Sequence, residues 1–186
     1  MRKNFGSKPA IYPMPVLIVA AYDENGAANA MTAAWGGIVD TNLIGICLSA
    51  GHKTTQNIFA KGAYTVSIAT AKHMVEADYL GIVSGNTEPE KLTKAGLHAV
   101  KAEHVDAPVI EELPMTLECK MVSYDKSTGY LIGEIVNISA DESILNEQGN
   151  VDPAKLNPIT YDPMNHTYLA LGQKVGNAYQ EGKKLK

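Results

Sequence analysis

Residues 49–57 hold the side chains best suited to bind a phosphate. They read Ser-Ala-Gly-His-Lys-Thr-Thr-Gln-Asn, and Gly51 permits a sharp turn before a helix that we expect to begin near Thr54 or Thr55. The first N–H groups of a helix lack partners within it and lie at the positive end of its dipole, so a phosphate binds well there. The segment also holds many side-chain donors: Ser49, His52, Lys53, Thr54 and Thr55. An ordinary helix start remains the alternative, because Ser and Thr open many helices that bind nothing.

Residues 29–35, Asn-Ala-Met-Thr-Ala-Ala-Trp, are unusual for a strand because alanine stands where β-branched residues are preferred. Small side chains would let a flat ligand approach the backbone. Thr32 could place a hydroxyl at the edge of a ring, and Met31 could pack against its face. Tight packing of the strand against a helix explains the same pattern equally well. We call residues 29–35 and 49–57 together the cradle.

The chain shows no nucleophile, metal or acid–base motif. It has no Gly-x-Ser-x-Gly and no Cys-x-x-Cys sequence. Cys47 and Cys119 each lie in an apolar run, where we expect them to be small buried hydrophobic residues. Four histidines have neither a helical pairing nor an obvious carboxylate partner: His73, His98, His104 and His166. Any chemistry would therefore need a cofactor.

Composition excludes several classes of protein. The formal net charge is −4, with Lys and Arg scattered along the chain, which argues against nucleic acid as a partner. The longest apolar runs are far too short to cross a bilayer, so we expect no membrane partner. The N-terminus has no apolar stretch of the secretory type, and we therefore expect a cytoplasmic protein.

The hydrophobic pattern predicts one mainly β domain over residues 1–186. Gly36 and Gly37 should break or bend the second strand. Short turns join most strands and the βαβ alternation of a parallel sheet is missing, which favours a closed antiparallel barrel. The predicted strands of this barrel are Val16–Tyr22, Ala28–Trp35, Leu43–Leu48, Tyr64–Ala69, Met115–Tyr124 and Tyr130–Ile138.

A helical insert is predicted at about residues 70–96, lying across one end of the barrel. Its first helix should end at Gly81, and its second should start with a capping box formed by Thr87 and Glu90. The tail, about residues 157–186, should end as a basic helix or a frayed end.

These motifs, in this order, resemble the flavin reductase-like family, the FMN-binding split barrels, and flavoredoxin-like members most closely. The resemblance rests first on residues 29–35 and on Ser49-Ala-Gly-His-Lys-Thr54 one strand later. It continues through further stretches and so covers most of the chain from about Pro13: Ser84-Gly85 with Lys91, Leu117–Cys119, Gly133–Val136 and the tail from Asn157 to Gly172.

The resemblance implies an antiparallel Greek-key split barrel that forms a homodimer and binds one FMN per subunit. It places the cradle strand along the flavin ring system and the 49–54 loop at the phosphate. The predicted cofactor-binding residues are Asn29, Met31, Thr32, Ala33, Ser49, Ala50, His52, Lys53, Thr54 and Asn57.

Three readings remain open, of which the last is a split barrel that binds another phosphate-bearing or aromatic ligand, or none. The first is an FMN-binding oxidoreductase that reduces flavin with NADH or NADPH and passes electrons to an acceptor. The second is a flavoredoxin-type FMN electron carrier, with a redox protein as partner and little NAD(P)H reductase activity. Many members carry an aromatic residue after the tryptophan, whereas Gly36 and Gly37 open that place here.

Overall fold

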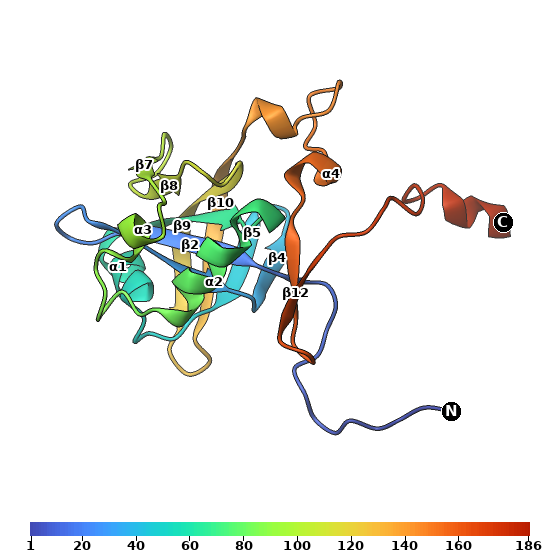
Figure 1. Ribbon diagram of the computed structural model, residues 1–186, viewed down its shortest axis with the longest axis horizontal. Coiled ribbons are helices and arrows are strands. Elements are labelled where there is room, and N and C mark those ends of the chain that lie inside the picture. Colours follow the sequence, from blue (N-terminus) through green and yellow to red (C-terminus); the bar gives the residue numbers. More distant parts are fainter.

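A curled seven-stranded antiparallel sheet dominates the computed structural model, which describes residues 1–186 (Figure 1). The strand order is β3-β2-β6-β9-β10-β5-β4. The two edge strands, β3 (Ala28–Ala33) and β4 (Gly36–Asp40), are consecutive in the chain and are separated only by Ala34 and Trp35. The sheet therefore closes on itself as a split barrel, which confirms the predicted fold class. The break expected at Gly36 and Gly37 lies just before them, at Ala34 and Trp35, because both glycines pair with β5 as the first residues of β4.

The remaining elements are as follows. The other sheet strands are β2 (Leu17–Tyr22), β5 (Leu43–Cys47), β6 (Ala63–Ile68), β9 (Met115–Asp125) and β10 (Tyr130–Ala140). Two smaller sheets consist of β1 (Met14–Pro15), β11 (Ile159–Asp162) and β12 (Thr167–Ala170), and of β7 (Ala99–Lys101) and β8 (Pro108–Ile110). The α-helices are α1 (Lys53–Lys61), α2 (Met74–Ile82), α3 (Lys91–Lys94) and α4 (Pro153–Leu156), and the 3-10 helices are η1 (Ala71–His73), η2 (Glu142–Ile144) and η3 (Glu181–Leu185).

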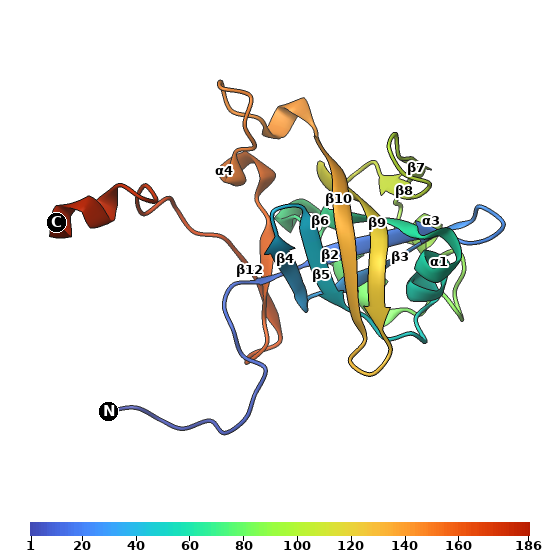
Figure 2. The same cartoon turned by 180° about the vertical axis from the view of Figure 1, so that it is seen from behind.

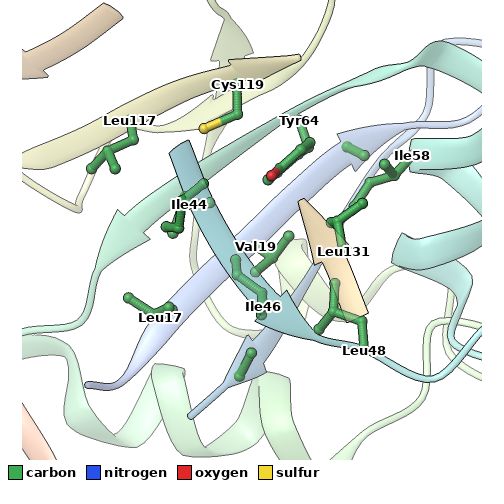
Figure 3. Packing of buried hydrophobic residues seen from close by; sticks show 13 residues of the cluster. Leu17, Val19, Ile44, Ile46, Leu48, Ile58, Tyr64, Leu117, Cys119 and Leu131 are labelled. Carbon is green, nitrogen blue, oxygen red and sulfur yellow. The ribbon is translucent and has the colours of Figure 1, made fainter. Parts of the chain in front are cut away.

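Strand β2 is buried on both faces, which explains why its sequence is apolar throughout rather than alternating. Leu17 and Val19 point into the barrel, where side chains from β2, β5, β6, β9 and β10 meet (Figure 3). Ile18 and Ala20 belong to a second cluster on the outside, together with Leu80 of α2. A strand of this kind needs a cover on its outer face.

The helical insert provides that cover, so its predicted position across one end of the barrel is wrong. Helix α2 packs on β3 and on the outer face of β2. It continues through Gly81 to Ile82, so Gly81 does not end it. The Cβ position of Gly81 lies against Thr32 of β3, which shows how close the helix comes to the cradle strand.

The predicted capping box is also wrong. The second helix of the insert is only the single turn α3, and its N-cap, Glu90, makes no side-chain cap bond. The Thr87 hydroxyl instead donates to the Ser84 carbonyl oxygen (3.1 Å), which closes a turn ahead of the helix. Thr87 therefore belongs to a local turn before the helix and does not cap it.

Cys119 is buried as expected, but Cys47 is exposed. Alternation along β5 directs Ile44 and Ile46 into the barrel and leaves Cys47 on the outer face, where its thiol donates to the Thr128 carbonyl oxygen (3.3 Å).

Two histidines have carboxylate partners that the sequence did not suggest. His98 contacts Glu112 (2.6 Å) and His104 contacts Glu118 (3.2 Å). Each partner lies 14 residues further along the chain, beyond the reach of helical periodicity.

Both ends of the chain extend away from the barrel on the same side (Figure 2). Residues 1–13 and 171–186 are exposed throughout, and the last of them form η3. None of the helices combines the length and the apolar character that crossing a bilayer requires.

Candidate functional site

The start of α1 is a helix N-terminus with free donors. His52 is the N-cap and its side chain makes no cap hydrogen bond, and the first turn holds no acidic residue. The backbone N–H groups of Lys53, Thr54 and Thr55 have no acceptor within the chain. This arrangement leaves the positive end of the helix dipole open to an anion. Gly62, in the left-handed conformation, ends the helix, as glycine commonly does at this position.

A buried hydrogen bond joins the two segments of the cradle. The Thr54 hydroxyl donates to Oδ1 of Asn29 over 2.9 Å, and both residues are almost fully buried. The helix start and strand β3 are thereby held side by side, as the cradle requires. The Asn29 amide nitrogen makes no hydrogen bond within the chain and lies against the backbone of Gly85.

The loop after α2 forms a third wall that sequence reasoning did not assign to the site. A side chain at Gly85 would collide with the Asn29 amide, so only glycine lets the loop come this close. The Asn86 side chain donates to the Gly51 carbonyl oxygen (2.9 Å) and ties this wall to the 49–54 loop. In the sequence, only the family resemblance singles out Ser84 and Gly85.

Lys91 holds that wall in place from behind. Its ammonium is buried and donates to the carbonyl oxygens of Leu80 (3.1 Å) and Val83 (2.8 Å) at the end of α2. Burial lowers the pKa of Lys91 to about 8. The lysine therefore satisfies carbonyls that a helix end leaves without partners.

Two adjoining hollows run along the cradle and share Asn29, Lys53 and Gly85. The inner cleft has a volume of 160 Å³ and is lined by Asn29, Met31, His52, Lys53, Thr54, Leu80, Gly81, Ile82, Val83, Ser84, Gly85 and Lys91. The outer groove has a volume of 330 Å³ and is lined by Asp23, Ala27, Ala28, Asn29, Lys53, Gln56, Gly85, Asn86 and Pro89. The two hollows adjoin at these shared residues, and Lys53 is the only charged residue that lines both.

The structure brings half of the predicted cofactor residues together at the inner cleft: Asn29, Met31, His52, Lys53 and Thr54. The others occupy different surroundings. Thr32 donates its hydroxyl proton to the Ala77 carbonyl of α2, and Ala33 packs in the barrel core. Ser49 and Ala50 are exposed on the loop, outside both hollows. Asn57 is buried and donates to the Ala21 carbonyl oxygen (3.2 Å), so it braces α1 on β2.

A larger cavity, of 660 Å³, lies elsewhere and contains no cradle residue. It is bordered by η1, η2 and the ends of β8, β10 and α4. Glu112 at its edge already pairs with His98. Both ring nitrogens of His73 are buried without a hydrogen-bond partner, and its Nδ1 lies 3.9 Å from a carboxylate oxygen of Glu76. We assign the candidate site to the cradle because the free backbone donors and Lys53 belong to one helix start, and residues 52–54 of that start line the inner cleft.

Comparison with solved structures shows which proteins share this fold. Flavoredoxin of Desulfovibrio vulgaris (Miyazaki F) is 36% identical, with a TM-score of 0.94 over 98% of this chain and 100% of that one. Flavoredoxin from Methanosarcina acetivorans is 27% identical, with a TM-score of 0.87 over 100% of this chain and 98% of the other. An FMN-binding domain of a flavin reductase-like enzyme from Shewanella baltica, 22% identical, shares the fold with a TM-score of 0.79 over 88% of each chain.

Sequence comparison identifies the family. The chain spans less than half the length of the first two curated relatives it matches, 43% and 45%, at 26% and 27% identity. The family model for the flavin reductase like domain matches residues 10–165, which include the barrel, the cradle and the insert. This match covers the start of α1, the small-residue strand β3 and the split barrel. The chain therefore belongs to the flavin reductase-like family.

Proposed function

We propose that this protein binds FMN in the cradle, with the phosphate at the start of α1. The observation that carries the proposal is the set of free N–H groups at residues 53–55, at a helix start where the Lys53 side chain lines the inner cleft. The free amide nitrogen of Asn29 and the flexible side chain of Met31 suit the polar edge and the face of the flavin ring. The residues present therefore fit the cofactor that the family implies.

We propose that the protein works as an oxidoreductase, with NADH or NADPH as reductant and a second molecule as electron acceptor. The bound flavin would supply the hydride and electron chemistry, and the chain would supply binding and orientation. The ionisable side chains at the inner cleft are His52, Lys53 and Lys91. Lys53 suits the phosphate, and Lys91 is committed to the end of α2, so neither is free to serve as an acid or base.

A flavoredoxin-type electron carrier is the second candidate, and a specific observation favours it. The match to the Desulfovibrio flavoredoxin extends over nearly the whole of both chains at a TM-score of 0.94. In this reading a redox protein would deliver or accept electrons, and NAD(P)H would reduce the flavin slowly.

We also propose a homodimer. Three large apolar side chains at the edge strand β4 and just before it are exposed: Trp35 (58%), Ile38 (65%) and Val39 (46%). A hollow of 460 Å³ lies beside them, and its lining holds no charged residue. An exposed edge of this composition is typical of a surface that pairs with another chain. Ile38→Glu should convert a dimer to a monomer in size-exclusion chromatography with light scattering.

Titration of the flavin-free protein with FMN tests the first proposal. Saturable binding with a yellow chromophore supports it, and no binding at high FMN would refute it. Stopped-flow bleaching of the loaded protein by NADH and by NADPH then separates the two functions. Fast bleaching by one nucleotide supports the reductase, whereas slow bleaching by both, with fast reduction by a protein donor, supports the carrier.

A further inference from the structure

Asp23 stands opposite Lys53 in the outer groove. Its Oδ2 lies 3.6 Å from the Lys53 ammonium, and the two side chains are 18% and 33% exposed. Both residues line the outer groove and the smaller hollow that continues beyond it along α1. The only cationic side chain of the outer groove therefore already has a carboxylate partner.

The Asp23 carboxylate is fixed in this position. Its Oδ1 accepts from the backbone N–H groups of Asn25 and Ala27, each over 2.9 Å, and these bonds define the turn between β2 and β3. The Asp23 N–H donates to the Ala27 carbonyl oxygen in the same turn (2.9 Å). The hydrogen bonds from Ala27 and Asn25, aided by the Lys53 charge, lower the pKa of the Asp23 carboxyl, which is therefore an anion at neutral pH.

We propose that Asp23 is a specificity-determining residue that weakens the hold of Lys53 on a flavin phosphate and so makes FMN exchangeable. The proposal rests on the FMN site proposed above. A phosphate at the start of α1 and the carboxylate compete for one ammonium, and the two anions repel each other across it. Because the turn holds the carboxylate in place, it cannot move away when the phosphate arrives. Riboflavin, which has no phosphate, should not sense the competition.

Asp23→Asn tests this directly. Asparagine keeps the oxygen that accepts from Asn25 and Ala27, so the turn should survive, while the negative charge is lost. We expect the dissociation constant of FMN to fall roughly three- to fivefold, the scale of a partly exposed charge pair, and that of riboflavin to stay unchanged. The FMN effect should shrink as salt is raised. Fluorescence titration of the flavin-free protein with each ligand measures both constants.

Glu24→Gln is the matched control. It removes the same charge one residue further along, and Glu24 forms no ion pair with Lys53. We expect it to change FMN binding much less than Asp23→Asn does. Equal effects of the two variants would show that FMN binding responds to the net negative charge of this region and not to the Asp23–Lys53 pair, which would overturn the proposal.

A double variant assigns the effect to the ion pair. In a Lys53→Met background the competition for the ammonium is gone and only the direct repulsion between the two anions remains, so Asp23→Asn should tighten FMN less than it does with Lys53 in place. An equal gain in both backgrounds would overturn the proposal. Weaker FMN binding by Asp23→Asn would mean that the carboxylate positions the lysine for the phosphate, and would also overturn the proposal. Failure of the proposed function looks different, because then neither FMN nor riboflavin would bind the wild-type protein at all.

Discussion

Replacing Lys53 by alanine should distinguish the contribution of the phosphate to FMN binding from that of the ring system. Lys53 lines both hollows of the cradle and follows the N-cap of α1 directly. If its ammonium contacts the phosphate, Lys53→Ala removes one charged hydrogen bond, for which mutational series give about 1.5–3 kcal/mol. This corresponds to a roughly 10- to 150-fold weaker FMN complex.

The lower end of that range is expected here, for two structural reasons. The Lys53 side chain is 33% exposed, so water weakens its interaction with an anion. Three backbone N–H groups at the start of α1 remain in the variant and continue to bind the phosphate. Isothermal titration calorimetry with FMN and with riboflavin measures the difference, and riboflavin should lose far less affinity.

Lys61→Ala provides the control for Lys53→Ala. It removes the same charge from the opposite end of the same helix, where Lys61 pairs with Asp106 (3.3 Å). That variant should leave FMN binding nearly unchanged. The reasoning fails if Lys53→Ala weakens FMN and riboflavin equally, because the lysine would then act on the ring system or on the fold instead of the phosphate.

Three further substitutions test the walls of the cradle. Gly85→Ala should weaken flavin binding and lower the melting temperature because its Cβ would collide with the Asn29 amide. Gly182→Ala, in the exposed C-terminal segment and with nothing within 4 Å of its Cβ position, should change neither, and equal behaviour of the two variants would contradict the close approach at Gly85. Thr54→Val should lower stability by about 1–3 kcal/mol in urea unfolding, since it leaves Asn29 Oδ1 buried without a donor, and an unchanged midpoint would refute the role of that bond. Lys91→Met should also destabilise, by about 1–3 kcal/mol, because two carbonyls lose their donor. The pKa of Lys91 in the folded protein, about 8, lies below the ordinary 10.5, so the unfolded chain binds more protons between these two pH values. The stability of the wild-type protein should therefore rise from pH 8 to 10.5 relative to that of Lys91→Met. Parallel stability profiles of the two proteins would exclude a lowered pKa of Lys91.

The main outline of the fold could be predicted because it depends on local sequence signals. The apolar runs of β2 and β5 and the turn at Gly26 identify strands and their connections without knowledge of the whole. The helix after Gly51 and its end at Gly62 follow from turn and capping preferences. The cradle could be found for the same reason, since each of its two segments is continuous in sequence.

The third wall could not be found in this way because it depends on contacts between distant residues. Gly85 is required by its approach to Asn29, and nothing around Gly85 in the sequence indicates that neighbour. Lys91 has the composition of an ordinary surface residue, yet it is buried because the end of α2 offers it two carbonyl oxygens. The position of the insert was also missed, because it depends on which face of β2 needs a cover.

The Thr54–Asn29 bond connects the two ends of the site in a way that bears on its function. Lys53 and the free N–H groups attract only the anionic part of a ligand, and the Asp23 carboxylate opposes part of that attraction. Asn29 instead belongs to the strand and faces the wall at Gly85, so its orientation affects whatever lies along β3. Thr54 joins α1 to that strand through its hydrogen bond to Asn29. In the proposed FMN complex, this bond would keep Asn29 oriented toward the flavin ring even where the phosphate is bound only moderately. Such a division would let a flavin be positioned well for electron transfer and still be released.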